Sequence, residues 1–229
     1  MANKASNFLK KLSPYNIQKG LRYLKHFGVK EFFVRLSDRL EPEEVPYGPW
    51  FAGHRATEEE QKRQRTHKFA DPVTFSIAVP LYRTPERYLR EMIASVQAQT
   101  YPHWELCLAN GSPEEEQLRK LLEEYAAEDP RICVKQLSEN ACIAGNTNAA
   151  LAMATGEYVG LLDHDDLLEP DTLFQVMSTL DAARQRKQPL PELLYTDEDK
   201  ISGDGSEYFQ PNLKPDFNPD LLRSNNYIC

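Results

Sequence analysis

The sequence predicts an α/β fold, a mostly parallel β-sheet with flanking helices, preceded by a helical N-terminal extension. From Asp71 onward, short apolar segments alternate with amphipathic segments of about ten to fifteen residues, a pattern typical of βαβ units. Polar clusters follow the apolar segments, at the sheet edge where α/β proteins bind ligands. We therefore expect a helical, basic extension and linker over residues 1–70 and a ligand-binding domain over residues 71–229.

The first forty residues have a helical apolar spacing with basic side chains between the apolar positions. Ser13 can cap a helix and Pro14 suits its first turn. Such a basic amphipathic segment can lie on an anionic membrane surface, so residues 1–40 are a candidate for peripheral membrane contact. The alternative is a helical pair packed on the main domain with a solvated basic face.

A linker and a short helix complete the extension. Residues 41–53 are rich in Pro and Gly, as linkers are. Residues 57–69 read as a polar helix in which Thr57 and Glu60 form a capping box.

The main domain is expected to contain five strands separated by helices. The strands are predicted at residues 73–82, 104–110, 131–137, 158–163 and 192–199. The helices are predicted at residues 84–99, 112–125, 144–155 and 170–183. Thr84 is expected to cap the first of these helices, and Ser112 with Glu115 to form a capping box on the second.

Composition narrows the class of protein. The chain has 229 residues, 41% hydrophobic and 27% charged, and no segment resembles a membrane span or a signal peptide, so we expect a cytoplasmic protein. Four cysteines lack zinc-ligand spacing and are expected to be reduced thiols. Residues 1–70 carry 14 Lys and Arg against 8 Asp and Glu, whereas the whole chain has a net charge of −8. The acidic main domain argues against nucleic acid as a partner.

Three acids crowd the end of the fourth predicted strand, in "LLDHDD". In extended backbone, Asp163 and Asp165 would point to the same side and His164 to the other. A hard divalent cation, Mg²⁺ or Mn²⁺, would relieve the repulsion between the two carboxylates and leave positions open for phosphate oxygens. Helix capping is the simpler explanation for Asp166 and Asp171.

Other acid-rich motifs fit less well. A helix–loop–helix calcium site counted from Asp163 would need Gly and Glu where Leu168 and Phe174 stand. A phosphatase of the haloacid dehalogenase type has DxDx[T/V] on its first strand, whereas Leu167 occupies that position here and the strand is the fourth. It remains the weaker alternative. The sequence has no GxSxG, P-loop or GxGxxG motif.

Two longer stretches together resemble the family 2 glycosyltransferases, which have the Rossmann-like GT-A fold. They are "FSIAVPLYRTPERYLREMIASVQAQTYPHWELCLANGSPEE" and "NACIAGNTNAALAMATGEYVGLLDHDDLLEPD". The resemblance covers about residue 71 to the end of the chain, with the motifs in the family's order and at its intervals.

The resemblance implies a role for particular residues. Pro80 and Tyr82 match the loop that lines the nucleotide base, and Asn110 stands where the family usually has a base-contacting Asp. Asn148 matches an Asn in the helix beside the donor. Asp165 is implied as the direct metal ligand, with Asp163 nearer the ribose and diphosphate and His164 beside the donor.

The implied function is inverting transfer of a sugar from a nucleotide-diphosphate sugar to a glycan or lipid-linked acceptor, in bacterial surface polysaccharide or cell-wall synthesis. Two departures matter. Asn110 brings no negative charge, which puts a uridine preference in doubt. The family's catalytic base lies on a later segment, so we expect it beyond Cys229, with Asp199 in "TDEDK" as a less favoured candidate. The alternative is a nucleotide-sugar-binding fragment without turnover.

Overall fold

The computed structural model describes residues 22–25, 28–30, 32–33 and 47–228, which form two compact units. Residues 56–195 form the larger unit. The smaller unit combines the described residues up to 55 with residues 196–228. Most of the predicted basic helical segment, including Ser13, lies outside the described residues, and the predicted domain boundary at residue 70 stays a prediction.

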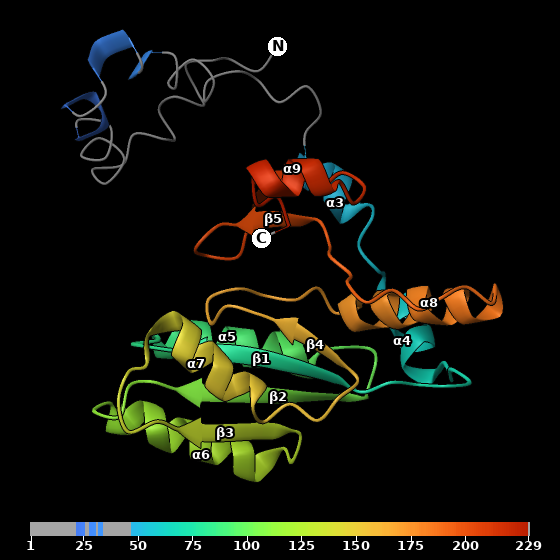
Figure 1. Cartoon of the computed structure of the whole chain (residues 1–229), viewed down its shortest axis with the longest axis horizontal. Coiled ribbons are helices and arrows are strands. Elements are labelled where there is room, and N and C mark those ends of the chain that lie inside the picture. The colour runs from blue at the N-terminus through green and yellow to red at the C-terminus, as the bar shows by residue number, and fades with distance from the viewer. Residues whose placement is uncertain (1–21, 26–27, 31, 34–46, 229) are drawn as a thin grey trace. The chain divides into compact units, whose positions relative to one another are not determined.

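The larger unit contains a four-stranded parallel sheet whose strands are connected by helices (Figure 1). In chain order its elements are α4 (Glu58–Thr66), β1 (Phe75–Leu81), α5 (Glu86–Gln97), β2 (Trp104–Asn110), α6 (Glu116–Glu128), β3 (Ile132–Gln136), α7 (Cys142–Leu151), β4 (Tyr158–Leu161) and α8 (Thr172–Gln185). The strand order β3-β2-β1-β4 means that the chain adds strands on one side of β1 and then crosses to the other. The predicted α/β fold with a mostly parallel sheet is confirmed, and β1 and β4 border its topological switch point.

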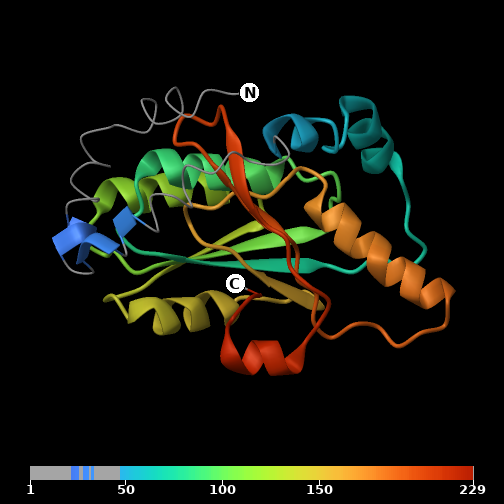
Figure 2. The same ribbon diagram turned by 90° about the horizontal axis from the view of Figure 1, so that it is seen from above.

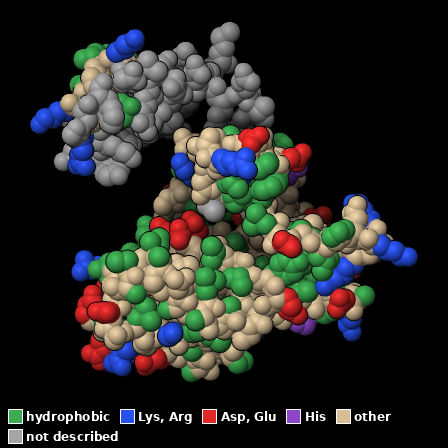
Figure 3. All heavy atoms as spheres, in the orientation of Figure 1, with side chains coloured by type: hydrophobic (Ala, Val, Ile, Leu, Met, Phe, Trp, Pro, Cys, Tyr) green, Lys and Arg blue, Asp and Glu red, His purple; other side chains and the backbone are tan. Residues whose placement is uncertain are grey.

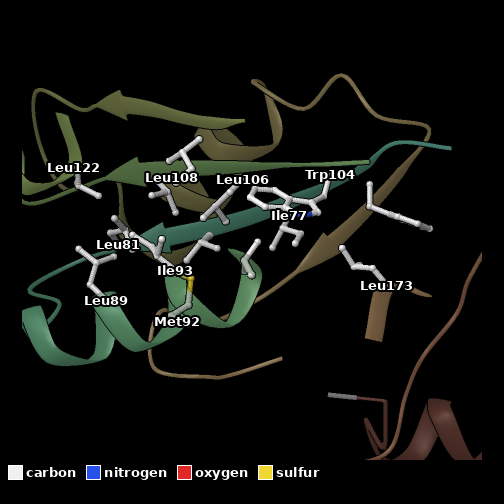
Figure 4. Packing of buried hydrophobic residues seen from close by; sticks show 14 of the residues in the cluster. Ile77, Leu81, Leu89, Met92, Ile93, Trp104, Leu106, Leu108, Leu122 and Leu173 are labelled. Carbon is white, nitrogen blue, oxygen red and sulfur yellow. The ribbon is translucent and has the colours of Figure 1, made fainter. Parts of the chain in front are cut away.

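One face of the sheet carries the main hydrophobic core. Strand register aligns apolar residues of β1 with those of β2 in the pairs Phe75–Trp104, Ile77–Leu106 and Val79–Leu108, all at most 4% exposed. Helix α5 presents Leu89, Met92 and Ile93 to this face (Figure 4). Burying each such side chain contributes about 1.5–3 kcal/mol, so this face supplies most of the stabilisation of the sheet.

The opposite face is lined by small residues and covered by α7. Ala78 of β1, Ala109 of β2 and Ala150 of α7 are fully buried against one another, which lets the helix approach closely. Figure 2 shows α7 on the other side of the sheet from α5 and α6. Beside it, Val159 and Leu161 of the edge strand β4 are 47% and 68% exposed. The surface over α7 shows few charged side chains (Figure 3).

The helix caps agree only partly with the sequence prediction. The capping box of Thr57 and Glu60 on α4 is present, as predicted. The predicted cap at Thr84 is wrong, because its hydroxyl is buried without a hydrogen-bond partner among the described residues. The predicted capping box of Ser112 is also wrong, because the Ser112 hydroxyl accepts a hydrogen bond from the backbone N–H of Arg83 instead.

The smaller unit is built on a two-stranded antiparallel sheet. Its elements are α3 (Tyr47–Ala52), β5 (Glu198–Ile201), β6 (Tyr208–Asn212) and α9 (Pro219–Ser224). The predicted fifth strand at residues 192–199 is therefore wrong in position and partner, since the strand begins at Glu198. The segment "SGDGS" after it lies in the loop of a hairpin, with Gly205 at φ +75°, so β5 pairs with the strand next along the chain. No helix in the described part of the chain is long and apolar enough to cross a membrane.

Candidate nucleotide-sugar site

The four strands of the parallel sheet end at one edge, and polar residues stand at each end. Tyr82 follows β1, Asn110 ends β2, Gln136 ends β3, and Asp163 comes two residues after β4. The sheet therefore gathers most of the predicted site residues along one edge, with the acids on one side of β1 and the amides on the other.

The acidic motif forms a turn rather than a strand end. Strand β4 stops at Leu161, and the backbone N–H of Asp166 donates to the carbonyl oxygen of Asp163 at 3.2 Å. The premise that residues 163–165 are extended, which would place the Asp163 and Asp165 side chains on the same side, is therefore wrong. The turn forms because acids have low strand propensity and favour turns.

The turn nevertheless leaves its acids available. Asp163 and Asp165 are exposed, and no hydrogen bond or ion pair holds either side chain within the described part of the chain. His164 is half-buried. These two solvated carboxylates follow β4, which borders the switch point of the sheet, and they are exposed to a cationic partner.

The donor set here suits a magnesium-like ion only in part. The described residues contain no group of three or more His, Cys, Asp or Glu side chains arranged to hold a metal. Two carboxylates, however, are the protein contribution that Mg²⁺ commonly takes when substrate phosphates complete its shell. Asp163 and Asp165 thus fit a metal that arrives with a diphosphate and not a preformed metal cage.

The end of β1 provides an aromatic surface. Tyr82 is 38% exposed, and the guanidinium carbon of Arg83 lies 5.2 Å from the centre of its ring. Pro80 pairs in register with Ala109 on β2, while β4 pairs with β1 only as far as Ala78. Proline is tolerated at this position because no ladder hydrogen bond is required toward β4.

Asn110 is placed differently from what its predicted role suggests. Its side chain is 0% exposed. Its Oδ1 accepts from the backbone N–H of Ser112 at 3.0 Å, and its Nδ2 donates to Oε1 of Gln136 at 2.8 Å. The exposed side chain of this pair is Gln136, which the sequence prediction did not include.

Asn148, the predicted donor-side residue of α7, is exposed. The buried asparagine of this helix is Asn146, whose Oδ1 accepts from the N–H of Ala141 at 3.1 Å and whose Nδ2 donates to Asn140 at 3.0 Å. A Cβ on Gly111 would lie 2.5 Å from that Nδ2. Gly111 therefore lets α7 approach the end of β2, a role that "NGS" alone did not reveal.

The "ATGEY" part of the family-like motif holds the start of β4 in place, at the amino ends of the strands and so opposite the candidate site. Glu105 on β2 accepts hydrogen bonds from the hydroxyl of Ser76 at 2.6 Å and from the backbone N–H groups of Thr155 and Gly156. A Cβ on Gly156 would lie 2.5 Å from the carbonyl oxygen of Thr74. These residues position β4, and through it the acidic turn.

Asp199, the less favoured candidate for the base, lies in the smaller unit. Its Oδ2 accepts a hydrogen bond from the hydroxyl of Tyr47 at 2.7 Å. The preceding acids are also engaged, because Asp197 accepts from the N–H of Lys214 and Glu198 accepts from Lys214 and Asn212. The "TDEDK" cluster thus helps to hold the hairpin.

Comparison with known proteins points to one family. Residues 76–185 match the model described as Glycosyl transferase family 2. The O-antigen biosynthesis protein RfbC of Myxococcus xanthus is 32% identical over 197 residues, which is 84% of this chain and 15% of RfbC. The uncharacterized protein y4gI of Sinorhizobium fredii is 43% identical over 153 residues, 67% of this chain and 16% of y4gI.

Two further similarities complete the comparison. The putative teichuronic acid biosynthesis glycosyltransferase TuaG of Bacillus subtilis is 36% identical over 103 residues, 43% of this chain and 38% of TuaG. A crystal structure of S. aureus TarS 1-349 is 28% identical, with a TM-score of 0.44, over 48% of this chain and 33% of that chain. The chain spans less than two fifths of the length of each of these relatives. With its matched segment running from β1 through α8, the chain belongs to the family 2 glycosyltransferases.

Proposed function

We propose that residues 56–195 bind a nucleotide-diphosphate sugar for transfer of its sugar, with inversion, to a glycan or lipid-linked acceptor. The observation that carries the proposal is the pair of exposed carboxylates, Asp163 and Asp165, that follow β4 at the switch point of a parallel sheet and have no hydrogen-bond partner among the described residues. Family membership supports the sugar-transfer chemistry, and the position supports phosphate-bearing ligands.

Five of the predicted residues have a part in donor binding under this proposal. Asp165 and Asp163 would hold Mn²⁺ or Mg²⁺, which would neutralise charge on the departing diphosphate. The ring of Tyr82 offers its exposed surface to the nucleoside. Asn148 and His164 flank the donor from α7 and from the acidic turn.

The reaction also requires a base that removes the proton of the acceptor hydroxyl. Asp199 is poorly suited, because its carboxylate already accepts a hydrogen bond from Tyr47. We place the base in another segment of the whole protein, in keeping with the greater length of the relatives.

The biological setting follows from the relatives by analogy. RfbC is named for O-antigen biosynthesis and TuaG for teichuronic acid biosynthesis. We propose a role in bacterial surface polysaccharide or cell-wall synthesis on the cytoplasmic side, with peripheral membrane contact through residues 1–40.

Donor binding can be tested by thermal unfolding. UDP, dTDP or GDP is expected to raise the melting temperature when Mn²⁺ is present, since a ligand at 100 times its Kd stabilises by about 2.7 kcal/mol. Asp165→Ala should abolish the part of the shift that depends on Mn²⁺. Asp216→Ala, at an exposed aspartate of the smaller unit, is the matched control and should retain it. If none of the nucleotides stabilises the wild-type chain, the proposal that it binds a nucleotide-sugar donor is wrong.

A binding fragment without turnover is separated from an enzyme by a second measurement. Release of free sugar or nucleoside diphosphate from a donor sugar, lost in Asp165→Ala, would exclude the fragment. Phosphate release from a generic phosphomonoester would instead favour the phosphatase.

A further inference from the structure

A chain of hydrogen bonds fixes the direction of two side-chain amides at the ends of β2 and β3. It begins at the backbone N–H of Ser112, which can only donate and which bonds Oδ1 of Asn110 at 3.0 Å. The Asn110 amide is thereby oriented with Nδ2 toward Gln136, where it donates to Oε1 at 2.8 Å. The Oε1 of Gln136 must accept this bond, so its Nε2 is turned away from Asn110.

The two amides differ in exposure, and this decides which can meet a ligand. Asn110 is 0% exposed and has both ends of its amide engaged. Gln136 is exposed, and its Nε2 has no partner among the residues that the structure describes. At the ends of β2 and β3, this pair of amides therefore offers solvent a neutral hydrogen-bond donor.

The position of Gln136 relative to the acids suits the base of a nucleotide. Gln136 pairs in register with Asn110, which pairs with Leu81 on β1, while the acidic turn follows β4 on the far side of β1. Neighbouring strands lie about 4.8 Å apart, so the ends of β4 and β3 are separated by three such spacings. An extended nucleoside diphosphate with its phosphates at Asp163 and Asp165 covers a comparable distance along this edge.

We propose that Gln136, held by Asn110, is the residue that contacts the nucleobase, and that its outward Nε2 selects a base with a carbonyl oxygen at position 4 of a pyrimidine or position 6 of a purine. Uracil and thymine present O4, and guanine presents O6, as acceptors, whereas cytosine and adenine present amino donors in the corresponding place. Under this proposal Asn110 orients Gln136, and Gln136 contacts the base in place of an acid at position 110. The inference rests on the proposed binding of a nucleotide-diphosphate sugar.

Two variants reverse the outward group by different routes. In Asn110→Asp, residue 110 still accepts from Ser112 N–H but can no longer donate, so Gln136 turns its Nε2 inward and its Oε1 outward. In Gln136→Glu, residue 136 keeps the bond from Asn110 and presents an acceptor directly. The second variant changes only an exposed side chain, so it tests the proposal even if a buried aspartate unfolds the first.

The dissociation constants of UDP and CDP with Mn²⁺ are the measurement, because the two ligands differ only at the base. The wild-type chain should bind UDP about tenfold more tightly than CDP. With CDP, the Nε2 of Gln136 would face the amino group of cytosine, and one hydrogen bond would be lost. Both variants should bring this ratio to about one or below it. Lys135→Ala, at the neighbouring exposed residue of β3, should leave the ratio unchanged, and inorganic pyrophosphate should bind every variant as it binds wild type.

The outcomes separate this inference from the function beneath it. A wild-type preference for CDP, or an unchanged UDP-to-CDP ratio in Gln136→Glu with pyrophosphate binding intact, overturns the assignment of Gln136 while donor binding stands. Failure of the wild-type chain to bind either nucleotide overturns both.

Discussion

Single residues that carry no reactive group set much of the geometry around the site. Gly156 is a clear case, because a Cβ there would lie 2.5 Å from the carbonyl oxygen of Thr74 and 2.8 Å from the hydroxyl of Ser76. The sequence shows a Gly before an apolar strand but not what lies beside it. The acids at 163 and 165 could be recognised from the sequence, because their charge in an apolar context is visible without a fold.

We expect Gly156→Ala to destabilise the larger unit by about 1–3 kcal/mol, because the new methyl group overlaps backbone that cannot move aside cheaply. Gly160→Ala in β4 is the matched control, since a Cβ there meets no atom of the described residues within 4 Å. Urea unfolding followed by circular dichroism measures both. Equal stability of the two variants would show that the start of β4 can shift.

At the scale of the strand and its neighbours, Glu105 fastens β4 to the sheet. Burial raises the pKa of the Glu105 carboxyl. Hydrogen bonds from Ser76, Thr155 and Gly156 lower that pKa by more than burial raises it, so it lies below its ordinary value. A carboxyl with a lowered native pKa stabilises the fold above its unfolded pKa of about 4.3. That contribution is lost as the pH falls through the native pKa.

Glu105→Gln should therefore make the stability of the protein less dependent on pH in the acidic range. Wild type should lose stability steadily below about pH 4.3, whereas the variant should be less stable at pH 7 and lose less on acidification. Urea midpoints between pH 3 and pH 7 give the comparison. Parallel curves for the two proteins would mean that another carboxyl dominates the acid response.

Elements differ in how far the sequence predicted them. The first four strands were predicted because each is a short apolar segment, alternating in the first, and β2 was predicted residue for residue. The fifth strand was misplaced because the sequence prediction starts it at the apolar run "ELLY". The strand instead begins at Glu198, where the chain can pair with β6 across the turn that follows Ile201. The cap at Ser112 failed because its hydroxyl is used for Arg83, a contact that only the assembled sheet creates.

At the scale of the molecule, the division into two units has a direct consequence for stability. Every buried member of the main core lies within residues 56–195, from Val73 to Leu180. We expect a protein of residues 56–195 to unfold cooperatively in urea, because its core is complete without the smaller unit. Circular dichroism and tryptophan fluorescence should give coincident transitions, Trp104 being the sole tryptophan of that segment. A gradual loss of signal would show that the core depends on residues outside it.

The register between β2 and β3 determines which side chain lies beside Asn110 at the ends of these strands. Asn110 faces Gln136 only because Leu106 is aligned with Ile132, four positions earlier in both strands. A slip of one residue would place Lys135 opposite Asn110 and offer a cation in place of a neutral amide. The packing of two apolar side chains near the start of these strands thus decides which functional group stands at their ends. An insertion early in β3 could change what the edge recognises without altering any residue there.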